Sequence, residues 1–140
     1  MSTAISIETK YLPSSDVSLP ALALQVTRLV DSYMLWIGTT DAAPEDVSKA
    51  PLQGNLARDW ACAMPAITSG VPAPATSLFR SSSSDVSLSM AQRLARRFRK
   101  QIFLSVDVPP TFLSMGQGSK LLLEVEKGVV EILKEMEIAP

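Results

Sequence analysis

The chain has 140 residues, 46% of them hydrophobic and 19% charged, a length and composition that suit one globular domain and exclude a disordered chain. Its formal net charge is −1, which gives no overall attraction to nucleic acids or anionic membranes. One cysteine, Cys62, cannot form an internal disulfide, and the lack of any histidine excludes Ser-His-Asp and Cys-His triads and most zinc sites.

These features predict a soluble intracellular protein. A lone cysteine fits a reducing compartment, the amino terminus lacks the pattern of a secretory signal, and no apolar run reaches the roughly 20 residues that span a bilayer. We expect no cofactor and no metal ion. Carboxylate, lysine or tyrosine chemistry is compatible with the composition, so the sequence disfavours an enzyme without excluding one.

Three strands are predicted first. Residues 4–12 alternate isoleucine with polar side chains, a period of two that indicates a half-buried strand. Residues 21–30, up to and including Val30, place leucine and valine on one face and predict a second strand, although their leucines and alanines also suit a helix. Residues 33–40 predict a third strand, joined to the second by a short turn at Asp31 and Ser32 as an antiparallel hairpin.

The middle of the chain is interrupted by prolines and small polar residues. Residues 40–54 contain Pro44 and Pro51 and predict a long surface loop. Residues 55–64 are compatible with either a strand or a helix. Residues 75–80 predict another short strand.

Two amphipathic helices are predicted in the second half, separated by a strand at residues 101–106 and a loop at residues 107–119. Ser89 or Ser87 would cap the first helix. Its apolar stripe comprises Leu88, Ala91, Leu94, Ala95 and Phe98. The apolar face of the second comprises Leu122, Val125, Val129, Leu133 and Met136, with Ile132 beside them.

This order of elements predicts one α+β domain over residues 1–140, with a sheet of about six mainly antiparallel strands and two helices. Two helices can cover only one face of such a sheet. The strand at 33–40 nevertheless carries Met34 and Trp36 on the face opposite its other apolar residues. We therefore expect either a sheet that folds on itself as a sandwich or a partner chain that covers the second face.

Basic residues are concentrated around the first helix, where six basic residues and one acidic residue lie between Arg80 and Lys100. Arg93, Arg97 and Lys100 share one helix face because they are four and three residues apart. They could form a docking surface for an acidic protein patch, or a solvated helix end that complements the helix dipole. A nucleic-acid-binding module using residues 89–100 is the alternative, but no aromatic platform accompanies the arginines.

Trp36 also has two interpretations, an anchor for a partner protein or a filler of the core. The candidate protein-binding residues are therefore Arg93, Arg96, Arg97, Lys100 and Trp36. No residue is predicted to be catalytic or to bind a cofactor or metal.

Several segments occur together in an order that points to one family. They are residues 27–38 (TRLVDSYMLWIG), 55–57 with 63–64, 76–78, 90–96 (MAQRLAR) with 100–105 (KQIFLS), and the acidic final helix at 126–137. Over about residues 16–137, the chain resembles the proteasome assembly chaperone 4 family. It departs from the family pattern in the greater length of the loops at 40–54 and 107–119.

The resemblance implies a non-catalytic chaperone that forms a heterodimer with proteasome assembly chaperone 3, a protein of similar fold. The pair would bind α-type subunits of the 20S proteasome, notably the fifth, guide assembly of the α-ring, and leave as β-type subunits join. It would work in the cytoplasm and nucleus, with no nucleic-acid or membrane partner. The family fold, an antiparallel sheet with helices, agrees with the fold predicted from the residues, and the partner chaperone would cover the second face.

Overall fold

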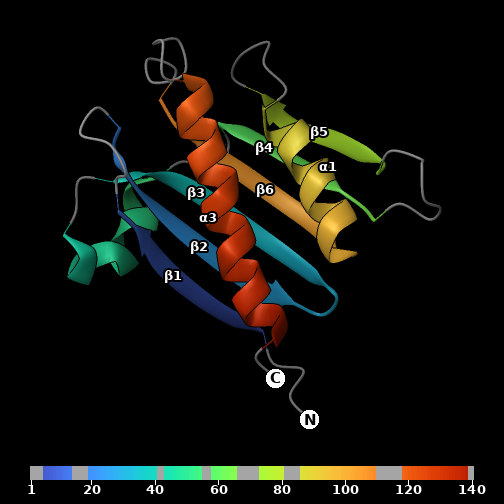
Figure 1. The fold of residues 1–140 in the computed structure, drawn as a ribbon, viewed down its shortest axis with the longest axis horizontal. Helices are drawn as coiled ribbons and strands as arrows, with labels where there is room; N and C mark the ends of the chain where they lie inside the picture. Colours follow the sequence, from blue (N-terminus) through green and yellow to red (C-terminus); the bar gives the residue numbers. More distant parts are fainter. Residues whose placement is uncertain are drawn as a thin grey trace.

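A computed structural model of the chain describes residues 5–13, 19–40, 43–54, 58–65, 73–80, 86–109 and 118–138. The strands are β1 (Ser6–Leu12), β2 (Ala21–Leu29), β3 (Ser32–Thr40), β4 (Asp59–Ala63), β5 (Ala75–Arg80) and β6 (Gln101–Asp107). The helices are the 3₁₀ helix η1 (Pro44–Gln53) and the α-helices α1 (Val86–Phe98) and α3 (Gly118–Ile138). Figure 1 shows one sheet with α1 and α3 on the same face.

The six strands form one sheet in the order β1-β2-β3-β6-β4-β5. Four neighbouring pairs are antiparallel, and only β3 and β6 are parallel. The predicted α+β fold with a mainly antiparallel six-stranded sheet is therefore confirmed. The β2–β3 hairpin turns at Val30 and Asp31, and Asp31 has the left-handed φ of 55° that aspartate tolerates in turns. The prediction that Val30 lies on the apolar face is wrong, because its side chain is 68% exposed in this turn.

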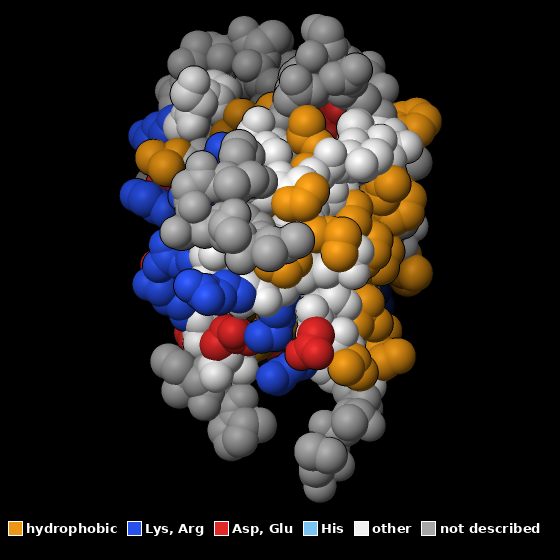
Figure 2. Space-filling model, turned by 90° about the vertical axis from the view of Figure 1, so that its right-hand side faces the viewer, with side chains coloured by type: hydrophobic (Ala, Val, Ile, Leu, Met, Phe, Trp, Pro, Cys, Tyr) orange, Lys and Arg blue, Asp and Glu red, His pale blue; other side chains and the backbone are white. Residues whose placement is uncertain are grey.

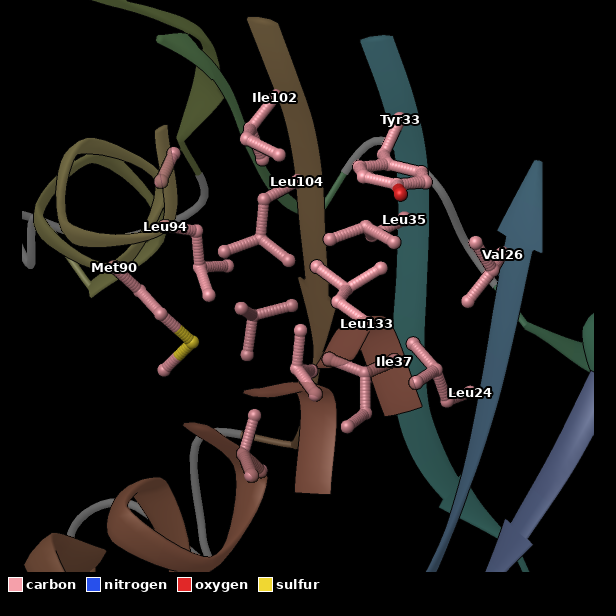
Figure 3. Packing of buried hydrophobic residues seen from close by; sticks show 14 of the residues in the cluster. Leu24, Val26, Tyr33, Leu35, Ile37, Met90, Leu94, Ile102, Leu104 and Leu133 are labelled. Atoms are coloured by element: carbon pink, nitrogen blue, oxygen red, sulfur yellow. The ribbon is translucent and has the colours of Figure 1, made fainter. Parts of the chain in front are cut away.

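The core lies between the sheet and the two α-helices. Figure 3 shows side chains of β3 and β6 directed toward α1 and α3. The buried residues drawn there include Tyr33, Leu35 and Ile37 of β3, Ile102 and Leu104 of β6, Met90 and Leu94 of α1, and Leu133 of α3. Burying an aliphatic side chain of this size contributes about 1.5–3 kcal/mol, so this one layer holds both helices on the sheet.

Helix α1 begins earlier than the predicted caps allow. Because it starts at Val86, Ser87 and Ser89 lie inside the helix, and the predicted capping box is wrong. The Ser87 hydroxyl donates instead to the carbonyl oxygen of Asp59 at 2.5 Å, which ties the helix to β4. Met90 joins the buried stripe, whereas Leu88 is only partly buried.

At the start of helix α3, the buried face is shifted by one residue from the face predicted by the sequence. Leu121, not the predicted Leu122, is buried there, while the rest of the predicted face is buried as expected. Three consecutive leucines, residues 121–123, open the helix, so their sequence alone does not show which one faces the sheet.

The predicted loop at 40–54 is wrong over most of its length, because Pro44–Gln53 forms the ten-residue 3₁₀ helix η1. Ala50 of η1 packs on Ala23 and Trp36, on the sheet face opposite α1 and α3. The ambiguous segment at 55–64 contains strand β4. Of the predicted loop at 107–119, residues 110–117 lie outside the described residues.

Candidate protein-binding surfaces

The sheet face away from α1 and α3, called here the open face, carries apolar residues side by side. Strand register places Met34 of β3 next to Phe103 of β6, and Phe103 next to Cys62 of β4. The same row continues outward through Thr27 on β2 to Ile7 on β1, and on the other side to Thr76 on β5. The row therefore crosses all six strands, with a sulfur–aromatic–sulfur centre that suits apolar contact.

A second row runs parallel to the first. Trp36 of β3 lies next to Ser105 of β6, followed by Trp60 of β4 and Phe79 of β5. Ile7 is 63% exposed and Phe79 is 49% exposed, although both occupy strand positions. In Figure 2, hydrophobic side chains run along one side of the molecule and basic side chains along the opposite side. Polar residues interrupt the two rows at Thr27 and Ser105, but most of their members are apolar. A concentration of apolar side chains on one face is typical of a protein-binding surface.

One end of the open face is covered by η1, and Trp36 lies beneath that cover with 6% of its surface exposed. Its indole Nε1 donates to Oδ2 of Asp107 at 3.2 Å, and Oδ1 of Asp107 forms an ion pair with Nε of Arg58 at 2.8 Å. This burial favours the core-filling interpretation of Trp36 over direct contact with a partner. At this corner of the sheet, η1 therefore covers the second face.

Arg93 of α1 is held by α3. Its Nε and Nη2 donate to the two carboxylate oxygens of Glu126 at 2.9 and 2.6 Å, a bidentate pair. These hydrogen bonds raise the pKa of Arg93. The guanidinium therefore ties the two helices together, although its side chain remains 55% exposed.

Lys100 is held in a similar way at the other end of α1. Its Nζ lies 3.1 Å from Oε1 of Glu137 and 5.9 Å from the centre of the Tyr33 ring. The Tyr33 hydroxyl donates to Oε2 of the same carboxylate at 2.5 Å. Burial, together with the hydrogen bond to Glu137, raises the pKa of Tyr33. For Glu137, burial alone would raise the pKa, but hydrogen bonds from Tyr33 and Lys100 hold it below its usual value.

Arg96 and Arg97 are exposed, and within the described ranges neither has an ion pair. The structure thus separates the four predicted basic residues into two that brace α1 against α3 and two that face solvent. The prediction that Arg93, Arg97 and Lys100 share one helix face is wrong for Lys100, because α1 ends at Phe98 and Arg99 takes a left-handed φ of 55°. Sequence spacing also did not show that acidic residues of α3 pair with Arg93 and Lys100. Their role in binding a partner stays a prediction.

The described part of the chain shows neither a metal-binding cluster nor a membrane-spanning helix. No group of three or more acidic, cysteine or histidine side chains there is placed to hold a metal ion. Among the helices of those residues, none combines the length and apolar character needed to cross a bilayer.

Comparison with known proteins gives a consistent result. The family model of proteasome assembly chaperone 4 matches residues 21–108. Proteins named proteasome assembly chaperone 4 from Mus musculus and Homo sapiens are each 36% identical over 115 residues, covering 82% of this chain and 74% of theirs. A chain in the crystal structure of a chaperone complex for yeast 20S proteasome assembly has the same fold, with a TM-score of 0.65, 16% identity, and coverage of 94% of this chain and 96% of that one. The chain described here belongs to the proteasome assembly chaperone 4 family.

Proposed function

We propose that this protein is a non-catalytic chaperone of 20S proteasome assembly that works as a heterodimer. Family membership supports the assembly role. The observation that carries the heterodimer is the open face, whose apolar rows include Ile7 and Phe79, exposed by about half or more. An apolar sheet face of this kind is stable in water when a second protein covers it.

The proposed partner is proteasome assembly chaperone 3, a protein of similar fold. Two sheets pack face to face at about 10 Å, with side chains from the two inner faces interdigitating. Met34 and Phe103 would lie at the centre of such an interface, because they occupy the two middle strands of the open face, with Trp60 on the neighbouring strand β4. A stable pair buries on the order of 800 Å² on each partner.

The heterodimer binds α-type subunits, notably the fifth, and promotes assembly of the α-ring in the cytoplasm and nucleus. The opposite, helical side of the molecule stays accessible when the open face is covered. Arg96 and Arg97 lie on α1 on that side and are exposed, so they are the available members of the predicted basic set. We assign no nucleic-acid function, because the Arg93 and Lys100 charges are compensated by Glu126 and Glu137.

The heterodimer is tested with the double variant Ile7→Glu/Phe79→Glu and the control Val30→Glu. Val30 is 68% exposed but lies in the β2–β3 turn, outside the open face. In light scattering of mixtures with chaperone 3, we expect the unmodified chain and the control to give the mass of a one-to-one pair. The double variant should remain monomeric while keeping a native circular dichroism spectrum, because it places charge in the buried interface.

Two outcomes would count against these assignments. Normal pairing by the double variant would show that the open face is not the interface. Failure of the unmodified chain to pair with chaperone 3 would contradict the heterodimer itself.

A further inference from the structure

Helices α1 and α3 leave a groove between them on the outer surface of the molecule. They run in the same direction, because Arg93 of α1 pairs with Glu126, and Lys100, just after the end of α1, pairs with Glu137, further along α3. Two hollows of 490 and 440 Å³ lie along the helix pair and share Leu123 and Glu126, so they form one continuous groove. The Arg93–Glu126 pair crosses it near the middle.

The two halves of the groove differ in chemistry. The half at the amino-terminal ends of the helices is mainly apolar, lined by Val86, Met90, Leu122 and Leu123. Leu123 is 53% exposed, so it offers apolar surface to a partner. An apolar partner side chain placed against Leu122 and Leu123 would remove this surface from water, at about 25 cal/mol per Å².

The other half is basic. Its lining includes Arg97 of α1 and Lys127, Val130 and Lys134 of α3. Glu126 also borders it but is neutralised by Arg93, which leaves Glu131 as the remaining acidic side chain in its lining. Three cations therefore stand against one unpaired carboxylate. Such a site attracts an acidic partner.

The walls of the groove also constrain the shape of its occupant. Both walls are α-helices whose backbone hydrogen bonds are made internally, so they offer no donors or acceptors to an extended strand. A helical segment satisfies its own backbone and needs only side-chain contacts. Apolar residues on one face of a helix, spaced by three and four, can fill a groove of this kind.

We propose that the α1–α3 groove binds an acidic amphipathic helix of the proteasome α-type subunit. This inference rests on the chaperone function proposed above. Apolar side chains of that helix cover Leu122 and Leu123, and its acidic side chains meet Arg97, Lys127 and Lys134. Nucleic acid fits less well, because Glu131 and the apolar half of the groove oppose a phosphate backbone.

The test uses the heterodimer with chaperone 3 and individually purified α-type subunits, including the fifth, as probes. One variant, Leu123→Glu, alters the apolar half, and its control is Leu52→Glu on η1, where the leucine is 85% exposed. A second, Lys127→Glu/Lys134→Glu, alters the basic half. Its control is Lys10→Glu/Lys49→Glu, which changes the net charge equally at exposed sites on β1 and η1.

We expect both groove variants to pair normally with chaperone 3 but to bind the α-type subunit about tenfold or more weakly, with the controls unchanged. Added salt should weaken binding of the unmodified heterodimer more than that of the lysine variant.

Unchanged binding by both groove variants would overturn the groove assignment and leave the chaperone function intact. Binding of no α-type subunit by the unmodified heterodimer would overturn the proposed function itself. A single-stranded oligonucleotide could also displace the subunit. If that displacement required Lys127 and Lys134, it would overturn the acidic-helix assignment.

Discussion

At the scale of single residues, Glu137 connects the end of α3 to two other elements. Its carboxylate accepts from the Tyr33 hydroxyl of β3 at 2.5 Å and from Nζ of Lys100, just after α1, at 3.1 Å. Both donors stabilise the ionised form. The last turn of a helix is usually the first part to fray, so these contacts hold α3 where solvent would otherwise compete for it.

The resulting prediction concerns pH. The folded-state pKa of Glu137 is lowered, so its contribution to stability is present above the unfolded pKa of about 4.3 and is lost as pH falls through the folded pKa. Glu137→Gln should lower the free energy of unfolding by about 1 kcal/mol at pH 7, a value that allows for partial exposure. In urea unfolding experiments, the difference from the unmodified chain should shrink below about pH 4.

Tyr33→Phe is the matched control for this prediction. It removes the hydroxyl but keeps the buried ring, and it leaves the Lys100–Glu137 ion pair in place. The acid-side loss of stability should therefore persist in Tyr33→Phe and be absent in Glu137→Gln. A difference between Glu137→Gln and the unmodified chain that stays constant down to pH 3 would contradict the ionic role of Glu137.

At the scale of elements, η1 depends on a glycine that lets it approach Trp36. A Cβ on Gly54 would lie 2.3 Å from Cζ2 of the indole, which is fixed by its hydrogen bond to Asp107. Gly54→Ala should therefore displace η1 and lower the free energy of unfolding by about 1–3 kcal/mol. The indole NH resonance of Trp36 should shift, because its hydrogen bond to Asp107 lies under this helix.

Gly128→Ala provides the contrasting case. Its added Cβ would lie 2.7 Å from Cδ1 of Leu12, the flexible end of a side chain that can turn away. Alanine is also favoured over glycine in a helix by about 1 kcal/mol. This variant should be at least as stable as the unmodified chain. Equal stability of Gly54→Ala and the unmodified chain would show that η1 is not fixed on the indole.

The sequence predicted elements with strong periodicity and missed those defined by tertiary contact. Alternation in residues 21–30 identified β2, whereas the segment at 55–64 became a strand because β4 pairs with β5 and β6. η1 was missed because its prolines and small residues resemble a loop, and its buried residue Ala50 gives no periodic signal. Packing also decided that Leu121, within a run of leucines, faces the core.

For the candidate surfaces too, local sequence patterns predicted some features and tertiary contacts decided the others. Apolar residues on both faces of the third strand predicted a second apolar sheet face that needs a cover, because period-two alternation assigns faces directly. Local spacing also found the basic residues of α1. Pairing of Arg93 and Lys100 with Glu126 and Glu137 spans more than 30 residues in sequence, so no local pattern could reveal which cations remain free.

At the scale of the whole molecule, the two sides of the sheet differ in chemistry. One side is covered by α1 and α3, and α1 carries exposed basic residues. The other side is apolar, with η1 packed over Trp36 at one end. The net charge of −1 conceals this separation. The arrangement suits a protein that holds one partner on its open face and contacts another through its helices.

This asymmetry predicts how stability depends on concentration. If chaperone 3 covers the open face only in the folded state, it stabilises the chain by mass action, by about 1.4 kcal/mol for each tenfold rise in free partner above the dissociation constant. For a chain of this size, the unfolding midpoint of an equimolar mixture should rise by roughly 5 °C per tenfold concentration in scanning calorimetry. Val30→Glu should follow the same curve, and Ile7→Glu/Phe79→Glu should show no dependence. An unfolding midpoint that does not change with concentration in the unmodified mixture would mean that the open face is stable in water without a partner. Pairing through the open face would then have no thermodynamic basis.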